Sequence, residues 1–277
     1  MNELALLADT VEAAAYRDMF AAAPVELAQA LSMRAEQLDG VTLLIARGIP
    51  DPVFVRAIGM GNDGRADATL IDAVTAVFND AKTGSYLVHV NPSLAPRELA
   101  PLLEARGFTL AKRRTWAKMV RGAAPLSPCD TTLTVREANP NERTATSQAI
   151  AGAFGMPPPF AAWVQKLAER SAWTMMTALD GDRVVGGGLL YIDRGVDEDP
   201  VSWLGLGGVA LDARRHHAHR AIMAARIEHA LAHGCKHIVT ETGEPIGNEP
   251  NPSLRNMYRL GFERVASRLN YVSPPQS

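Results

Sequence analysis

The sequence predicts an α/β protein that consists of two successive domains of similar construction. Its 277 residues are long for one domain and comfortable for two. Residues 122–128 have the composition of a linker, with two prolines and small residues in no regular period. A helix–glycine–strand pattern at Gly84 recurs at Gly234, and a helix–Gly-Phe–strand pattern at Gly107 recurs at Gly261. Both recurrences are separated by about 150 residues, the size of one domain.

The composition is that of an ordinary globular protein, 47% hydrophobic and 21% charged, which allows a sizeable core. A formal net charge of −2 gives no bulk basicity, so we expect neither nucleic acid nor a membrane as a partner. Cys129 and Cys235 provide neither a disulfide framework nor a metal-knuckle spacing. No apolar run is long and clean enough to span a bilayer, and the first residues lack the basic start of a secretion signal. We therefore expect a cytoplasmic, reducing location.

Apolar periodicity and turn residues predict the elements of each half. Before the linker we expect helices over 10–20, 68–81 and 96–105 and strands over 41–46, 53–58, 86–90 and 109–120. After it we expect helices over 145–154, 160–172, 214–233 and 253–260 and strands over 133–136, 173–178, 184–192, 201–211, 237–241 and 264–272. The corresponding domains are residues 1–123 and 130–277.

The turn after Leu211 is the strongest candidate for a binding site. A strand that runs straight into a helix aims the helix's free backbone N–H groups at the strand's end, and these donors attract phosphate together with the helix dipole. Arg214, Arg215 and Arg220 add positive charge there. The alternative is a solvated basic first turn, which opposes the dipole and itself favours an anion. We therefore predict an anion site suited to a pyrophosphate.

The same residues resemble those of a known family. The strand Trp203-Leu-Gly-Leu-Gly-Gly-Val-Ala-Leu211 and the following Asp212-Ala-Arg-Arg-His-His-Ala-His-Arg220 resemble the central strand and the R-x-x-G-x-G/A pyrophosphate loop of the GNAT N-acetyltransferase superfamily. Ser253-Leu-Arg-Asn-Met-Tyr-Arg-Leu-Gly-Phe262 is similar to its second cofactor helix. The resemblance covers most of 133–272, and 14–121 is more loosely similar to the N-terminal half of tandem GNAT proteins.

The resemblance implies two tandem GNAT-like domains, each with a mixed, mostly antiparallel sheet flanked by helices, and acetyl-CoA as the acyl donor. The strand backbone at Val209, Ala210 and Leu211 is expected to pair with the pantetheine. The loop and helix start are expected to hold the pyrophosphate, and the second helix completes the cofactor site. The remaining expected cofactor residues are Arg214, Arg215, His216, His217, Ala218, His219, Arg220, Ser253 and Asn256.

Two departures from the family pattern fall on the pyrophosphate loop. Aligned on Arg214, the two loop glycines become His217 and His219. Their imidazoles could turn outward, donate to phosphate themselves, or block the site, and the sequence leaves these alternatives open. We expect binding, because histidine can adopt ordinary helical backbone angles and the loop need not distort. A third departure is the family's usual tyrosine acid, which falls on Met257, and the adjacent Tyr258 is expected to be a packing or surface residue.

A general base must accept a proton from an ammonium substrate near the cleft. Glu241 is the first choice, because it ends the predicted strand beside the central one. Glu244 on the next loop is an alternative. The acidic loop Asp197-Glu198-Asp199 is a further alternative, either as a base or as an attractor for a cationic amine.

The histidine cluster also raises the question of a metal. His216 and His219 would share a helix face, whereas His217 would not. No carboxylate is found at ligand spacing beside them, so no metal is expected.

The first half is interpreted as having lost its cofactor site. Its glycine-rich segment 59–64 stands at the matching strand-to-helix turn, but Arg65 is the only nearby cation and Asp63 opposes phosphate. We expect this half to be structural or to form one wall of the substrate cleft.

Two functions remain open at this stage. The first is an acyl-CoA-dependent N-acetyltransferase that transfers an acetyl group to a primary amine of a small molecule or an aminoacyl substrate. A homodimer is one of the open assembly states of such an enzyme. The second is a non-catalytic acyl-CoA-binding or regulatory module, which the substituted glycines and the missing tyrosine favour. The fold alone does not determine the acceptor.

Overall fold

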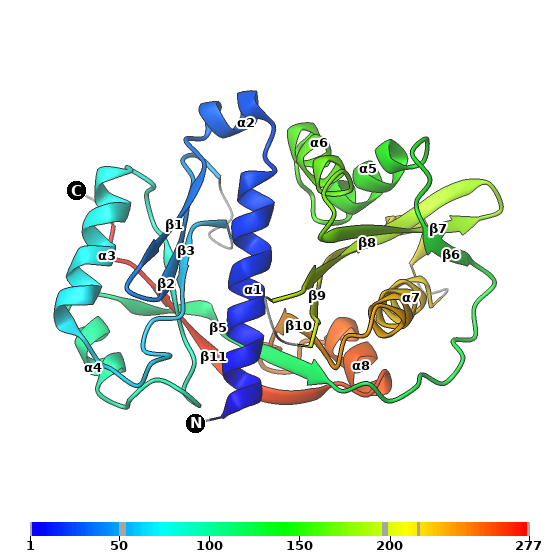
Figure 1. The fold of residues 1–277 in the computed structure, drawn as a ribbon. Coiled ribbons are helices and arrows are strands. Elements are labelled where there is room, and N and C mark those ends of the chain that lie inside the picture. The colour runs from blue at the N-terminus through cyan, green and yellow to red at the C-terminus, as the bar shows by residue number, and fades with distance from the viewer. Residues whose placement is uncertain (1, 50–53, 196–198, 215–216, 276–277) are drawn as a thin grey trace. The chain divides into compact units, whose positions relative to one another are not determined.

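The structure is a computed structural model that describes residues 2–49, 54–195, 199–214 and 217–275. It is an α/β protein with two compact units (Figure 1). Unit 1 comprises Met1–Met119, Glu241–Asn251 and Arg264–Ser277, and unit 2 comprises Val120–Thr240 and Pro252–Glu263. No helix in the described part of the chain combines the length and the apolar character that crossing a membrane requires.

Unit 1 contains a mixed sheet whose strands follow the order β1-β2-β3-β4-β11-β5. The β1–β2, β2–β3 and β4–β11 pairs are antiparallel, whereas β3 and β4 are parallel. Its helices are α1 (Glu3–Ala21), α2 (Val25–Ala30), α3 (Ala68–Asp80) and α4 (Leu99–Glu104). Its strands, apart from the last two residues of β5 and the first of β11, are β1 (Arg34–Leu38), β2 (Val41–Ile45), β3 (Arg56–Ile58), β4 (Leu87–Val90), β5 (Thr109–Arg121) and β11 (Glu263–Val272).

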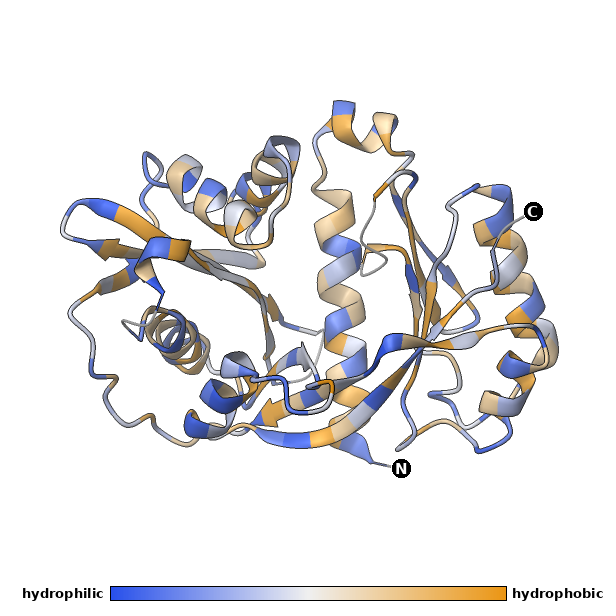
Figure 2. Cartoon of the chain, turned by 180° about the vertical axis from the view of Figure 1, so that it is seen from behind, coloured by the Kyte–Doolittle hydropathy of each residue, from blue (hydrophilic) through white to orange (hydrophobic). Residues whose placement is uncertain are grey.

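Unit 2 contains strands in the order β10-β9-β8-β7-β6, all antiparallel except the parallel β9–β10 pair. Its helices are α5 (Arg143–Ala153), α6 (Pro158–Leu167), the short 3₁₀ helix η2 (Leu211–Ala213), α7 (Ala218–Ala232) and α8 (Pro252–Arg259). Its strands are β6 (Thr134–Glu137), β7 (Trp173–Asp180), β8 (Arg183–Asp193), β9 (Val201–Val209) and, except for its last three residues, β10 (His237–Gly243). Figure 2 shows hydrophobic residues along the strands, and most of β8 is buried.

The predicted repeat is present in the pairing of the strands. In each unit, successive antiparallel pairs, two in unit 1 and three in unit 2, are followed by a parallel pair that a helix connects: β3–α3–β4 in unit 1 and β9–α7–β10 in unit 2. The helices begin at Ala68 and Ala218, and the strands after them begin at Leu87 and His237, both 150 residues apart. The two units are therefore built on one supersecondary frame.

Some predicted boundaries were wrong. Helix α1 begins at Glu3 instead of residue 10, because the Asn2 side chain caps it by accepting from the Ala5 amide. Helix α7 begins at Ala218 instead of residue 214, and strand β1 and helix α2 had no counterpart among the predicted elements.

The strand expected over 264–272 exists as β11, but it packs in unit 1. Its register with β4 runs from Leu269↔Val90 to Val272↔Leu87. The compact units are therefore not two simple stretches of sequence, and the boundaries 1–123 and 130–277 stay a prediction about the repeat.

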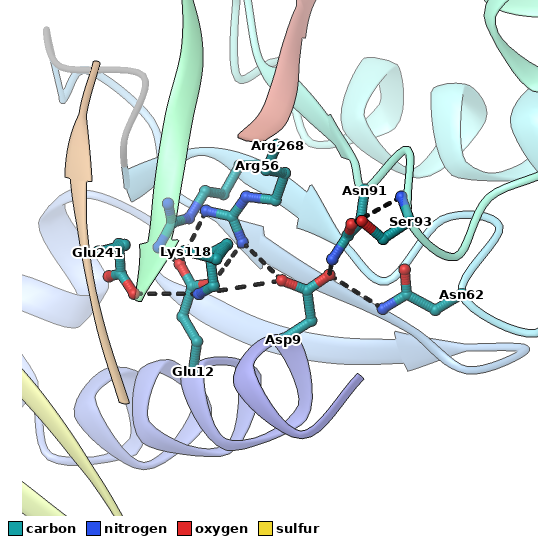
Figure 3. Close-up of polar contacts among 9 residues, drawn as sticks. All are labelled: Asp9, Glu12, Arg56, Asn62, Asn91, Ser93, Lys118, Glu241 and Arg268. Carbon is teal, nitrogen blue, oxygen red and sulfur yellow. Dashed lines mark hydrogen bonds and ion pairs between the residues drawn. The ribbon is translucent and has the colours of Figure 1, made fainter. Parts of the chain in front are cut away.

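Unit 1 contains a buried cluster of charged side chains, here called the charge cluster (Figure 3). Glu12 lies at its centre and accepts from Lys118 at 2.6 Å and from Arg268, and it lies 2.9 Å from Arg56. Lys118 also contacts Glu241 at 3.0 Å. The cluster, completed by Asp9, consists of Asp9, Glu12, Arg56, Lys118, Glu241 and Arg268.

Charge balance explains how unit 1 tolerates this cluster. Three carboxylates meet three cations, so no charge is left without a partner of opposite sign. Burial alone would raise the pKa of Glu12, but the charges of Arg268, Lys118 and Arg56 outweigh it and hold that pKa well below its usual value. Glu12 therefore stabilises the fold above its unfolded-state pKa, and this contribution is lost as pH falls through the lower folded-state pKa.

Replacing the central carboxylate tests this arrangement. We expect Glu12→Gln to lower the free energy of unfolding by about 3–5 kcal/mol, because three buried cations lose their shared partner. The measurement is urea-induced unfolding. Glu36→Gln is the matched control, because Glu36 pairs with Arg34 at the surface, where a loss below about 1 kcal/mol is expected. Similar losses in the two variants would contradict the central role of Glu12.

Candidate functional site

The candidate site lies in unit 2, where β9 extends beyond its pairing with β10. The registered pairs run from His237↔Val201 to Val239↔Trp203, and the Thr240 hydroxyl then donates to the Leu204 carbonyl at 2.9 Å. The last part of β9 continues past this point to Val209. A ligand can therefore approach β9 on the side that faces β10.

A bulge interrupts β9 in the same region. The register with β8 shifts between Gly187 and Leu189, and Leu206 on β9 has a φ of 49°, in the left-handed region. Bulges of this kind re-aim the backbone and often lie next to active sites. Here the bulge is followed by Gly207 and Gly208, which bring no side chain to the pocket wall.

A pocket of about 580 Å³ opens beside this strand end. The pocket is lined by the end of β9, the start of α7, the start of α8 and the C-terminal end of α5. Its lining residues are Ala153, Phe154, Gly207, Gly208, Val209, Arg214, His217, Ala218, His219, Arg220, Pro252, Ser253, Arg255 and Asn256.

Hydrophobic packing holds the start of α7 at the pocket. Ala218 and Ile222 of the helix pack in one buried cluster with Val209 at the end of β9, Ala213 of the 3₁₀ helix and Val185 of β8. The apolar face of the first turn thus fixes the direction of the helix axis. Its free N–H groups are thereby presented to the pocket.

Among the described residues, no side chain caps the N-terminus of α7. The first N–H groups of a helix have no intrahelical partner, which here concerns Ala218, His219 and Arg220. The N-cap residue, His217, makes no capping hydrogen bond with its side chain. These amides, together with the positive end of the helix dipole, can accept an anion at the pocket wall.

The matching helix start in unit 1 is closed. Asp67 caps α3, and its carboxylate accepts from the amides of Thr69 and Leu70 at 2.8 and 3.2 Å. The only nearby cation foreseen from the sequence, Arg65, is paired with Asp63 and Asp39. The protein's own carboxylate therefore occupies the position at which a phosphate would bind.

His217 adopts a backbone conformation that the sequence argument did not foresee. Its φ of 57° and ψ of 8° lie in the left-handed region, so the expectation of ordinary helical angles was wrong for this residue. The family pattern has glycine here, the residue that adopts this region without strain. Histidine is one of the few other residues enriched in it. The loop thus keeps the left-handed conformation at this position, with backbone strain at His217. The exposed side chain of His217 borders the pocket.

His219 lies within the helix and is held by α8. The Asn256 amide nitrogen lies 3.3 Å from its Nδ1, and because an amide nitrogen only donates, Nδ1 accepts and Nε2 carries the proton. Burial, followed by the positive charge of Arg226, lowers the pKa of His219 to about 4. The imidazole is therefore neutral near pH 7.

The other predicted cofactor residues are only partly brought together. Arg214 and Arg220 line the pocket with Ser253 and Asn256. Arg214 also donates to the carbonyls of Val209 and Ala153 at 3.4 Å, and Arg220 donates to the Cys129 sulfur at 3.3 Å. Arg215 and His216 lie outside the described residues.

The three residues expected to pair with pantetheine differ in their placement. Val209 ends β9 and lines the pocket. The Ala210 amide donates to the Val185 carbonyl at 2.9 Å, and Leu211 begins the 3₁₀ helix with 74% of its surface exposed. Among these three, only Val209 lines the pocket, and the pairing with pantetheine stays a prediction.

Glu241 lies in the charge cluster of unit 1, 3.0 Å from the Lys118 ammonium (Figure 3). Glu244, the alternative, accepts from Arg264 at 2.7 Å and from Ser267 at 2.9 Å. The acidic loop lies outside the described residues except for Asp199. The role of Glu241 as general base stays a prediction.

The tyrosine positions behave as the sequence indicated. Tyr258 is 49% exposed, whereas Met257 is buried. In the described residues, no group of three or more His, Cys, Asp or Glu side chains could hold a metal ion.

Sequence reasoning missed several pocket residues. Ala153 and Phe154 come from the end of α5, far along the chain from β9, and carried no recognisable motif. Gly207 and Gly208 were visible as a glycine-rich run in the central strand, which could have indicated close approach by a ligand.

The comparisons with known proteins agree with this geometry. Residues 142–262 match the family model described as the Acetyltransferase (GNAT) family. The matched residues include β9, α7 and α8, so the similarity to this family falls on the part of the chain that forms the pocket. No curated protein matches the chain in sequence.

Solved structures share the fold along most of the chain. A GCN5-related N-acetyltransferase from Kribbella flavida has a TM-score of 0.60 at 14% identity, with 87% of this chain and 90% of that chain covered. A tandem GNAT protein from the clavulanic acid biosynthesis pathway has a TM-score of 0.60 at 14% identity, with 86% and 78% covered. A GCN5-related N-acetyltransferase from Sphaerobacter thermophilus has a TM-score of 0.59 at 16% identity, with 86% and 82% covered. The resemblance to tandem GNAT proteins is thereby confirmed at the level of the fold.

Single glycine substitutions at the two loop histidines should have opposite effects on stability. We expect His217→Gly to raise the free energy of unfolding by up to about 1 kcal/mol, because it relieves the left-handed strain. His219→Gly should lower it by about 1 kcal/mol, because glycine is unfavourable inside a helix. Urea-induced unfolding measures both. Equal losses in the two variants would show that His217 is not strained.

Proposed function

We propose that the protein is an acyl-CoA-dependent N-acetyltransferase that transfers an acetyl group from acetyl-CoA to a primary amine of a small molecule or an aminoacyl substrate. The observation that carries this proposal is the uncapped start of α7 in the wall of a pocket at the free end of β9. The family match over the same residues supports it.

The residues of the pocket suit a CoA-type ligand. The amides of Ala218, His219 and Arg220 provide donors for a diphosphate, and the Arg220 side chain adds positive charge. Gly207 and Gly208 leave the strand backbone open to close approach. His219 is neutral and offers Nε2–H as a donor. The positive charge that attracts the phosphates therefore comes from the arginines and the helix dipole.

Acetyl-CoA supplies an activated thioester when it is bound. The chain itself holds the diphosphate at α7, orients the acyl arm along β9 and brings it close to the acceptor amine, which favours reaction by proximity. A base must take the proton of the ammonium form of the amine, and Glu241 remains our candidate for that role.

A non-catalytic acyl-CoA-binding or regulatory module is the second candidate. It is favoured by Met257 at the position of the family's tyrosine and by histidines at the loop glycines. Both candidates require binding of acyl-CoA, and they differ in turnover. Titration calorimetry with acetyl-CoA, combined with a thiol-release assay over a panel of amines, separates them: binding without turnover on any amine supports the second.

Arginine substitutions test which unit binds the ligand. We expect Arg220→Ala, alone or with Arg215→Ala, to weaken acetyl-CoA binding at least about tenfold, or about 1.4 kcal/mol, because charge-assisted bonds to phosphate are lost. Arg65→Ala is the matched control in unit 1 and should leave the affinity unchanged. Calorimetry measures all the affinities. If Arg65→Ala lowers the affinity and the unit 2 variants do not, unit 1 binds the ligand instead of unit 2.

The loop histidines give the same experiment a second arm. We expect the natural protein to bind, and the His217→Gly, His219→Gly double variant to differ by less than about tenfold. A large gain in affinity for the double variant would show that the histidines block the site, and the acetyltransferase proposal would fail.

A further inference from the structure

Arg226 on α7 is a buried cation that has no counter-ion among the described residues. It is 2% exposed, and burial lowers its pKa to about 10. Within the described residues, its guanidinium donates to backbone carbonyls alone: Nε to Ile222 at 3.2 Å, and Nη1 to Leu189 at 3.0 Å and Gly205 at 2.9 Å. Among the described residues no carboxylate pairs with it. An unpaired buried charge is costly, so a ligand that compensates it would gain strongly.

The same contacts leave one nitrogen of the guanidinium for a ligand. Nε and both hydrogens of Nη1 are used, whereas Nη2 has no acceptor in the described part of the chain. Nη2 lies against Gly207, a residue of the pocket wall, because a Cβ added at Gly207 would be 2.9 Å from it. The unused donor thus lies against a residue of the pocket wall, beside the bulge of β9.

The position of Nη2 along α7 separates it from the diphosphate site. Nε is anchored on Ile222, four residues after Ala218, which is about 6 Å further along the helix axis. Gly205 and Gly207, which flank the guanidinium, come before Val209 in β9. A CoA-type ligand whose phosphates bind the first turn of α7, and whose arm follows β9 back from Val209 toward Gly205, would place its acyl arm beside this nitrogen.

The hydrogen-bonding pattern selects the type of acceptor. A carboxylate that binds arginine bidentately takes two neighbouring nitrogens, but only one is unoccupied. A single oxygen that gains negative charge fits one rigidly held donor better, and preorganised donors of this kind stabilise developing oxyanions. Three backbone carbonyls hold the guanidinium in place before any ligand arrives.

We propose that Arg226 is a catalytic residue whose Nη2 donates a hydrogen bond to the carbonyl oxygen of the acyl donor's thioester. The inference rests on the proposed function. In the transfer, a bond forms between the amine nitrogen and the carbonyl carbon, and the carbon–sulfur bond breaks. The amine's proton goes to a base, and the sulfur leaves as the thiolate of CoA. Nη2 stabilises the negative charge that develops on the oxygen during this exchange.

Infrared difference spectroscopy with carbonyl-¹³C-labelled acetyl-CoA tests the proposal without knowledge of the acceptor. Bound to the natural protein, the thioester carbonyl stretch is expected at lower wavenumber than in solution, because the hydrogen bond polarises it. In Arg226→Met the stretch should return toward the solution value, while the affinity for free CoA, which lacks the acyl carbonyl, changes less than about threefold. Any acyl transfer found with an amine should slow about 100-fold or more.

A second variant covers the case in which Arg226→Met does not fold. Gly207→Ala keeps the arginine but places a methyl group against Nη2, and should shift the carbonyl stretch in the same direction. Gly152→Ala is the matched control, because a Cβ there meets nothing within 4 Å, and it should leave the stretch unchanged.

The possible results separate the two proposals. A lowered stretch in the natural protein that is lost in Arg226→Met, or in Gly207→Ala if the first variant is unfolded, supports the role of Arg226. Bound acetyl-CoA with an unshifted stretch, or with a shift that the variants retain, overturns that role and leaves the proposed function standing. Absence of acetyl-CoA binding to the natural protein overturns both.

Discussion

The N–H groups at the start of a helix need acceptors, and the two repeats of this chain meet that need differently. In unit 1, Asp67 satisfies the first amides of α3 with its own carboxylate. In unit 2, 150 residues later, His217 occupies the N-cap and leaves the first amides of α7 without a side-chain cap. The same strand–helix–strand arrangement thus has a capped helix start in unit 1 and an uncapped one in unit 2. The uncapped start lies in a pocket wall, and the proposed function depends on it.

The placement of buried charge follows the same division. The charge cluster of unit 1 is neutral overall, because its carboxylates and cations compensate each other. In unit 2, Arg226 is buried behind Gly207 of the pocket wall, with backbone carbonyls as its only acceptors in the described part of the chain. A charge cluster that is already compensated gains no free energy from a bound ligand. A buried cation without a counter-ion is stabilised when a ligand brings negative charge to it. The buried charge of Arg226 would therefore gain from an external anion or oxyanion.

Much of the fold was readable from the sequence, because apolar periodicity and glycine landmarks are local signals. The helix–Gly–strand landmarks at Gly84 and Gly234 correctly predicted the repeat, and they did so because glycine follows both connecting helices at φ near 80°. The placement of β11 was not readable, since the choice of a pairing partner depends on contacts distant in sequence. The strained backbone of His217 was missed because residue preference is only a statistical guide to φ. Arg226 gave no signal, because one arginine in a helix is ordinarily a surface residue.

A crystal structure of the protein with acetyl-CoA tests the central claim most directly. The account predicts a diphosphate within hydrogen-bonding distance of the backbone amides of Ala218, His219 and Arg220, and none at the start of α3, where Asp67 keeps its cap. A diphosphate bound at α3, or acetyl-CoA bound without contact to the start of α7, would contradict it.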